Sequence, residues 1–200
     1  MAGRQGAGSR RRRGPGRDAE PEVDRDLGPE PDHESVARKI LLDRLAERPR
    51  SRGELATQLA RRHVPDEIAE RMLDRFEEVG LVDDEEFAQL WVQSRQQSRG
   101  LSGRALALEL RRKGVADEIV RETIDAIEPE SEEEVARALV RKKLRSLRNV
   151  DDQVKVRRLV GALGRKGYGP GLAYRLVREE IGADVEALEA GDADDWSGHV

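Results

Sequence analysis

Apolar residues recur at helical spacing from residue 35 onward. Between Ser35 and Pro49 they fall on one stripe, with charged residues on the opposite side. This pattern predicts an amphipathic helix that ends near the proline. The positions on the apolar stripe are Val36, Ile40, Leu41 and Leu45.

Two further helices are predicted before Gly80. Ser51 is a suitable N-cap and Glu54 follows three residues later, so the second helix is expected to begin after the serine. The third begins near Pro65 and ends at Gly80, because proline suits the first turn of a helix and glycine suits its end. The side chains expected to be buried are Leu55 and Leu59, with Ala56 as a further candidate, then Ile68, Met72, Leu73 and Phe76.

The same pattern returns twice along the chain. A shift of 51 residues aligns Phe87 with Val36, Ala88 with Ala37, Trp91 with Ile40, Leu106 with Leu55, Leu110 with Leu59 and Val115 with Val64. A third copy begins at Ser131, with Val135, Ala136 and Leu139 in its first helix, and a shift of 53 then aligns Leu159, Leu163, Tyr168 and Leu172 with Leu106, Leu110, Val115 and Ile119. The pair Lys113–Gly114 returns as Lys166–Gly167 and stands as Arg62–His63 in the first copy.

These repeats predict an all-α protein of three tandem three-helix units, at 35–80, 81–129 and 130–183. One such unit is too small to close its own core, so we expect stacking between neighbours to complete the burial and to give an elongated, curved array. The flanks are Arg-rich and then acidic over 1–34 and acidic over 184–200. We expect both to be disordered, because they have too few apolar residues to offset the entropy of ordering.

Composition narrows the classes of function. The chain has 39% charged and 36% hydrophobic residues and no cysteine, which excludes a disulfide framework and a thiolate metal site. His33, His63 and His199 stand in unlike contexts, so we expect no metal or other cofactor. No apolar run reaches the roughly 18 residues of a membrane span, and none follows the N-terminal arginines. We therefore expect a cytoplasmic protein that does not enter the membrane.

The net charge of -4 is unevenly distributed. Residues 1–17 carry six arginines, residues 18–34 carry a charge of -7, and residues 184–200 carry six acids and no base. The body between them therefore carries +3. The run Arg10–Arg13 is interpreted as a solvated tail, with contact to nucleic acid or to the acidic segment after it as the alternative.

No catalytic motif is present in the sequence, and we expect a protein without enzymatic activity. The glycines of 167–171 lack the preceding strand that a dinucleotide site requires, so a turn between helices explains them better. Acidic clusters at Asp83–Glu86 and Glu130–Glu134 stand at predicted helix starts, where the helix dipole stabilises carboxylates. Helix capping is favoured for them over acid-base or metal chemistry.

Phe87 and Trp91 are four residues apart and share a helix face, with Leu90 beside them. Packing between stacked units is the favoured interpretation of these aromatic residues. Stacking of Trp91 on a nucleic-acid base is the alternative, and it would require an exposed ring.

Basic residues cluster where the second helix of each unit ends, at Arg61–Arg62, Arg111–Lys113 and Arg165–Lys166. Cations there complement the helix dipole, but further bases in the second and third units exceed what capping needs. We interpret them as a surface for a polyanion, with a solvated face as the alternative; phosphate contacts alone would be sequence-independent and sensitive to salt. The candidate residues are Arg61, Arg62, Arg95, Arg104, Arg111, Arg112, Lys113, Arg141, Lys142, Lys143, Arg145, Arg157, Arg158, Arg165 and Lys166.

The central repeat resembles the RecX family, the bacterial regulators of the RecA recombinase. The residues that carry the resemblance are Gly80–Asp84, Phe87, Ala88, Trp91, Arg95, Gly103, Leu106, Glu109, Leu110 and Lys113–Val115. The outer repeats match more loosely, and the resemblance covers about residues 35–182. It implies three tandem three-helix units that bind in the groove of the RecA filament on DNA and hinder its ATPase and strand exchange.

Three functions stay open at this point. The first is a non-enzymatic, monomeric modulator of the RecA filament that contacts RecA and DNA through the basic residues. The second is a stand-alone, sequence-independent nucleic-acid-binding repeat protein, for single- or double-stranded DNA. The third is a purely structural helical scaffold.

Overall fold

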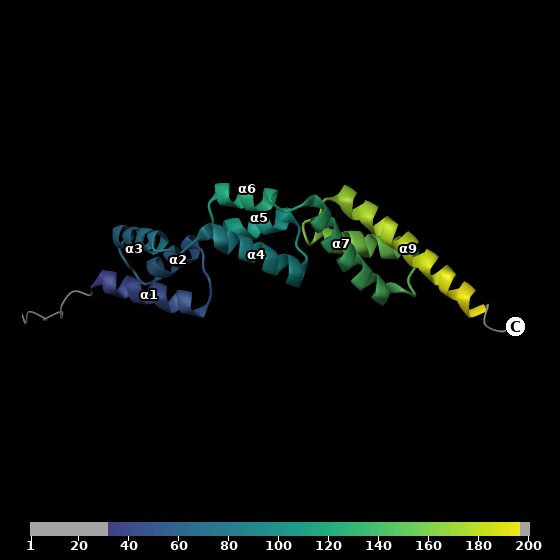
Figure 1. The fold of residues 1–200 in the computed structure, drawn as a ribbon, viewed down its shortest axis with the longest axis horizontal. Coiled ribbons are helices and arrows are strands. Elements are labelled where there is room, and N and C mark those ends of the chain that lie inside the picture. The colour runs from purple at the N-terminus through teal and green to yellow at the C-terminus, as the bar shows by residue number, and fades with distance from the viewer. Residues whose placement is uncertain (1–31, 197–200) are drawn as a thin grey trace, which may run out of the picture. The chain divides into compact units, whose positions relative to one another are not determined.

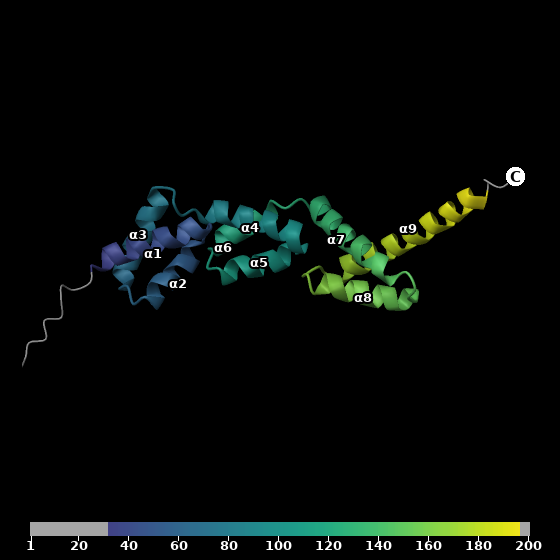
Figure 2. The ribbon, with the colours of Figure 1, turned by 90° about the horizontal axis from the view of Figure 1, so that it is seen from below.

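A computed structural model describes residues 32–196, with side chains to residue 183, and all of its regular structure is helical. The helices group into three bundles of three, each around its own hydrophobic core. Figures 1 and 2 show how they are arranged. They are α1 (His33–Glu47), α2 (Arg52–Arg61), α3 (Asp66–Glu78), α4 (Asp84–Arg99), α5 (Gly103–Arg112), α6 (Asp117–Asp125), α7 (Pro129–Leu144), α8 (Asp152–Gly164) and α9 (Pro170–Trp196), with a short 3-10 helix, η1 (Arg145–Leu147), before α8. No helix in this described part is long and apolar enough to cross a membrane. The prediction of three three-helix units is confirmed.

The predicted helix ends are close to the observed ones. Ser51 caps α2 by accepting a hydrogen bond from the Glu54 N–H, and Gly80 follows α3 with a positive φ of 70°. The first helix begins at His33, two residues earlier than predicted, because the Asp32 side chain accepts from the Glu34 N–H and caps it. Of the segment predicted to be disordered, 1–31 lies outside the described residues.

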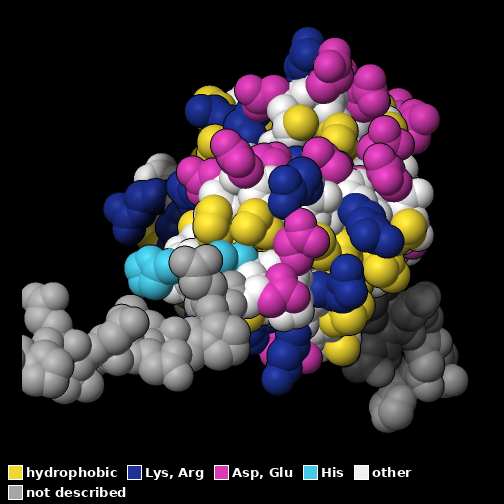
Figure 3. Space-filling model, turned by 90° about the vertical axis from the view of Figure 1, so that its left-hand side faces the viewer, with side chains coloured by type: hydrophobic (Ala, Val, Ile, Leu, Met, Phe, Trp, Pro, Cys, Tyr) yellow, Lys and Arg dark blue, Asp and Glu magenta, His cyan; other side chains and the backbone are white. Residues whose placement is uncertain are grey.

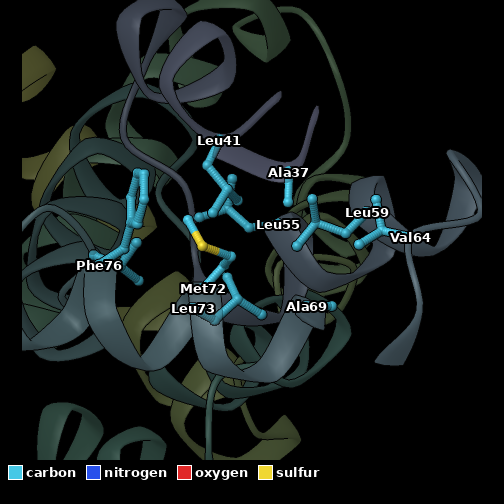
Figure 4. Packing of buried hydrophobic residues seen from close by; sticks show 10 residues of the cluster. Ala37, Leu41, Leu55, Leu59, Val64, Ala69, Met72, Leu73 and Phe76 are labelled. Atoms are coloured by element: carbon cyan, nitrogen blue, oxygen red, sulfur yellow. The ribbon is translucent and has the colours of Figure 1, made fainter. Parts of the chain in front are cut away.

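The first bundle closes around leucines from all three helices. Leu41 of α1, Leu55 and Leu59 of α2 and Leu73 of α3 are fully buried and point toward one another (Figure 4). The prediction for Val36 is wrong, because this residue is 38% exposed and its neighbour Ala37 is buried instead. Its aligned residue in the second bundle, Phe87, is 4% exposed, because it packs in the core of its own bundle.

The second and third bundles bury most of the residues that the repeat alignment predicts, while Trp91, Ile119, Val135, Leu139 and Leu172 are only partly buried. Leu106 and Leu110 form the centre of the second core, and Leu159, Leu163 and Tyr168 form that of the third. Helix α9 continues to Trp196, beyond residue 184, where a frayed acidic tail was predicted. Side chains from 184 and all of 197–200 lie outside the described residues.

Consecutive bundles are joined through their second helices, which meet end to end. The Ser51 hydroxyl at the start of α2 donates to the Lys113 carbonyl at the end of α5, at 2.5 Å. One bundle later, the Ser102 N–H donates to the Lys166 carbonyl at 3.0 Å. Because a helix N-terminus is partly positive and a C-terminus partly negative, this order is electrostatically favourable.

A carboxylate from the next bundle completes each joint. Asp84 accepts from the Arg52 N–H at 2.7 Å, and Glu132 accepts from the Gly103 N–H at 2.9 Å. Both donors are the first N–H of a second helix, which has no partner inside its own helix. Helix capping was predicted for both acidic clusters. Asp83 caps its own helix by accepting from the Glu86 N–H. Asp84 and Glu132 instead cap a helix of the preceding bundle.

Each joint also requires a glycine at the end of a second helix. A Cβ on Gly114 would lie 2.8 Å from the Gly53 Cα, and φ at Gly114 is 78°. A Cβ on Gly167 would lie 2.8 Å from the Ala105 Cβ, with φ at 93°. The same place in the first bundle holds His63 at φ 56°, where no other bundle of the described chain packs against it.

We predict that Gly114→Ala lowers the free energy of unfolding by about 2–4 kcal/mol, because it combines strain at positive φ with a clash against α2. Gly80→Ala is the matched control, since Gly80 has φ 70° and nothing within 4 Å of an added Cβ. The control substitution should lower the free energy of unfolding only by the strain at positive φ, about 1–2 kcal/mol. Urea unfolding of both variants measures the difference, and equal destabilisation would contradict the close approach at the joint.

Candidate functional site

The basic clusters lie where the sequence predicts them, at the ends of the second helices. Helix α2 ends at Arg61 with Arg62 as its C-cap, α5 ends at Arg112 with Lys113 as its C-cap, and Arg165 is the C-cap of α8. Since the ends of α5 and α8 form the joints, the clusters there lie beside the contacts between bundles. The cluster of the first bundle lies at the end of α2, which forms no joint with another bundle among the described residues.

The fifteen candidate cations divide into two groups by their partners. Four of them form ion pairs: Arg95, Arg111, Lys113 and Arg141. The others form no ion pair with any described residue; they are Arg61, Arg62, Arg104, Arg112, Lys142, Lys143, Arg145, Arg157, Arg158, Arg165 and Lys166. The larger group can therefore meet an external anion without first breaking an ion pair within the described part of the chain.

Two of the paired cations hold Trp91. The Arg95 guanidinium and the Lys113 ammonium each lie 3.9 Å from the centre of the indole ring. Trp91 Nε1 donates to Glu109 at 2.9 Å, and the ring stacks on Phe87. Because these contacts engage both the ring and its N–H, they support the packing interpretation of Trp91, and they give Arg95 and Lys113 a structural task.

Arg141 also has a structural task, because it neutralises a buried acid. Glu180 of α9 is only 6% exposed. It accepts from Arg141 Nε at 2.6 Å and from Nη2 at 2.9 Å, and Arg137 adds a weaker contact at 3.4 Å. The hydrogen bond to Glu180 raises the pKa of Arg141. The same hydrogen bonds link α7 to α9.

A hollow of about 330 Å³ lies at the joint between the first and second bundles. One wall is the face of α2 that carries Glu54 and Arg61, and the other is the turn Arg111–Gly114. We call it the junction hollow. Arg50 also lines it, and sequence reasoning missed this residue because it precedes a helix instead of ending one.

Glu54 is the one acid among the residues that line the junction hollow. Its carboxylate accepts from Lys113 at 2.7 Å and from Arg48 at 3.1 Å. Burial alone would raise the pKa of Glu54, but the hydrogen bonds from Lys113 and Arg48 outweigh it and lower the pKa. Glu54 therefore stays ionised and neutralises part of the positive charge there.

A second hollow, of about 350 Å³, lies between the end of α7, η1 and α8. Its charged lining consists of Lys143, Arg157, Arg158 and Arg165, with no acid among the lining residues. All four belong to the group without ion pairs in the described region. We call it the third-bundle hollow, and its four cations are donors suited to phosphate oxygens.

The chemistry that these sites support is binding. No group of three or more acids or histidines that could hold a metal ion occurs among the described residues. The hollows present donors and positive charge, which stabilise a bound anion.

Comparison with known proteins places all three bundles in one family. Models of the first, second and third three-helix domains of RecX match residues 37–76, 83–124 and 130–177. Regulatory protein RecX of Thermobifida fusca is 53% identical over 148 residues, covering 74% of this chain and 80% of the relative. Regulatory protein RecX of Streptomyces coelicolor is 50% identical over 155 residues, covering 76% and 82%.

Solved structures show the same fold. The crystal structure of RecX from Lactobacillus salivarius superposes with a TM-score of 0.68 at 17% identity, over 75% of this chain and 97% of the other. A second crystal structure, of a regulatory protein RecX, gives a TM-score of 0.64 at 22% identity, over 74% and 72%.

We predict that Glu54→Gln lowers the free energy of unfolding near pH 7 and has little effect near pH 3. A lowered folded pKa means that the carboxylate stabilises the fold above its unfolded pKa of about 4.3, and that this stabilisation disappears as the pH falls through the folded value. Urea unfolding at both pH values measures it. Glu67→Gln, an exposed first-turn acid of α3 without an ion pair to the described residues, is the control; an equal effect there would contradict the assignment.

Proposed function

The chain belongs to the RecX family of regulatory proteins, and we propose that it is a non-enzymatic negative modulator of the RecA recombinase. It would bind the RecA–DNA filament and inhibit its ATPase and strand exchange, and so regulate recombination and DNA repair. We further propose that it acts in the cytoplasm and as a monomer. The observation that carries the binding step is the third-bundle hollow, with four cations and no acid in its lining.

The charge pattern supports DNA as one component of the target. A single-stranded or duplex nucleic acid presents closely spaced phosphates, and cations without internal partners can meet them with little rearrangement. Arg157, Arg158 and Arg165 can each donate two hydrogen bonds to one phosphate. Contacts to phosphates do not distinguish one base from another, so the proposed binding is independent of DNA sequence and weakens as the salt concentration rises.

The arrangement along the chain supports a target with a repeating surface. Cations without an ion pair to any described residue recur at Arg61–Arg62, Arg112 and Arg165–Lys166, one set in each bundle at the end of a second helix. A filament of DNA coated by identical protomers also repeats along its length. Several weak contacts made in register bind more tightly together than any one alone.

We predict that the full-length protein suppresses DNA-dependent ATP hydrolysis by RecA at near-equal or lower molar ratios. The reason is that a modulator bound to the filament hinders its catalytic cycle. The assay follows phosphate release at low salt with single-stranded DNA present. A chain that begins at Asp32 should retain the suppression if the three bundles suffice, and an unchanged rate with the full-length protein would refute the proposed function.

We predict that Arg157→Ala with Arg158→Ala weakens binding to single-stranded DNA. The slope of log affinity against log salt should become less steep by about 0.7 for each phosphate that the variant no longer neutralises. Fluorescence anisotropy with a labelled oligonucleotide at several salt concentrations measures both changes.

Arg71→Ala with Arg121→Ala is the matched control. It removes the same charge from two exposed arginines that pair with Glu34 and Glu118. Equal effects of the two double variants would show that net charge, and not the third-bundle hollow, determines binding.

A further inference from the structure

An apolar hollow of about 290 Å³ lies beside the first joint; it shares Arg50 with the junction hollow, but none of the fifteen candidate cations lines it. Its lining includes Leu45 and Pro49 from the end of the first helix and the loop after it, Leu81 from the link between bundles, and Phe87 and Leu90 of α4. Leu81 is 50% exposed and Leu90 is 47% exposed. Figure 3 views the molecule from the end of the first bundle and shows hydrophobic side chains exposed among charged ones there.

The charges at this hollow have the opposite sign from those of the basic hollows. Asp83 and Glu86 line it and are exposed. Its one cation, Arg50, is already paired with Glu47 at 2.7 Å. Phosphate groups would be repelled here, whereas an apolar side chain with a lysine or arginine beside it would find both an apolar floor and an acidic rim.

The second joint is built from the same repeat, but there the position that corresponds to Pro49 is filled. Gly100 aligns with Pro49 by the shift of 51 residues. Gly100 is buried, and a Cβ there would lie 2.6 Å from Leu139 Cδ1. Pro49 is exposed. At the second joint, Leu139 fills the space beside Gly100. At the first joint, Leu81 and Leu90 remain exposed to solvent.

We propose that this apolar hollow is a docking site for a protein segment that carries an apolar side chain next to a basic one. An apolar centre with a charged rim is the usual anatomy of a protein–protein interface. This inference rests on the proposed function and assigns its two partners to different surfaces: the filament protein presents the segment that enters the apolar hollow, and the basic residues contact the DNA.

The test compares binding to two targets. We expect Leu81→Ser with Leu90→Ser to weaken binding to RecA filaments on single-stranded DNA by about tenfold or more, since two apolar side chains that contribute about 0.7 kcal/mol each together account for a factor of ten. Binding to the same DNA without RecA should change by less than about twofold, because no DNA contact is altered. Filaments held with a non-hydrolysable ATP analogue and a fluorescent label on the variant allow both measurements.

Leu42→Ser with Leu108→Ser is the matched control, because each of these leucines is 48% exposed and neither lines the hollow. It should bind filaments like the wild type. Glu86→Lys tests the acidic rim and should also weaken filament binding, while it leaves every apolar side chain in place. Circular dichroism and thermal melting confirm that every variant is folded.

The outcomes separate the two ideas. Wild-type protein that fails to bind filaments would refute the proposed function itself. Wild-type binding that the Leu81 and Leu90 substitutions leave intact would overturn the docking site alone. Equal weakening of binding to filaments and to naked DNA would also overturn the docking site, because the hollow would then belong to the surface that contacts DNA. Normal filament binding by Glu86→Lys would overturn the proposal that the docked segment carries a basic side chain.

Discussion

The close approach of successive second helices is the contact on which the bundle arrangement depends. Helix α2 begins against the turn that ends α5, and α5 begins against the turn that ends α8. Glycine at 114 and 167 lets the backbones meet, and Asp84 and Glu132 satisfy the amide that would otherwise lack a partner. Burial of Asp84 raises its pKa, although the Arg52 N–H opposes the shift. Each joint thus combines steric fit with hydrogen bonding at the same few residues.

Much of the fold could be predicted because each helix of the repeat is specified by residues within that helix or next to it. Helical spacing, Ser51 as a cap and Gly80 as a stop identify each helix without reference to anything distant. Burial depends on neighbours, and for this reason Val36 and Phe87 align in sequence but differ in exposure. Asp84 could be recognised as an acid at a helix start, but only the packing of two bundles reveals that it caps a different helix.

The candidate site was predicted less completely, because charge alone does not reveal pairing. Arg95, Lys113 and Arg141 have the same sequence signature as Arg157 and Arg158, yet they hold Trp91 and Glu180 within the fold. Their acid partners are 14, 59 and 39 residues away in the sequence. The spacing of neighbouring residues therefore could not predict these pairs. The third-bundle hollow arises from an irregular element, η1, at the connection where the third repeat departs from the other two.

His63 also determines how the array could be extended by protein engineering. A bundle inserted ahead of the first would place its second helix against residues 62–64, as α2 meets 113–115 in the existing joint. The imidazole at 63 would then occupy the space that a glycine leaves empty at 114. A lengthened variant therefore needs glycine at 63, as the existing joints have at 114 and 167.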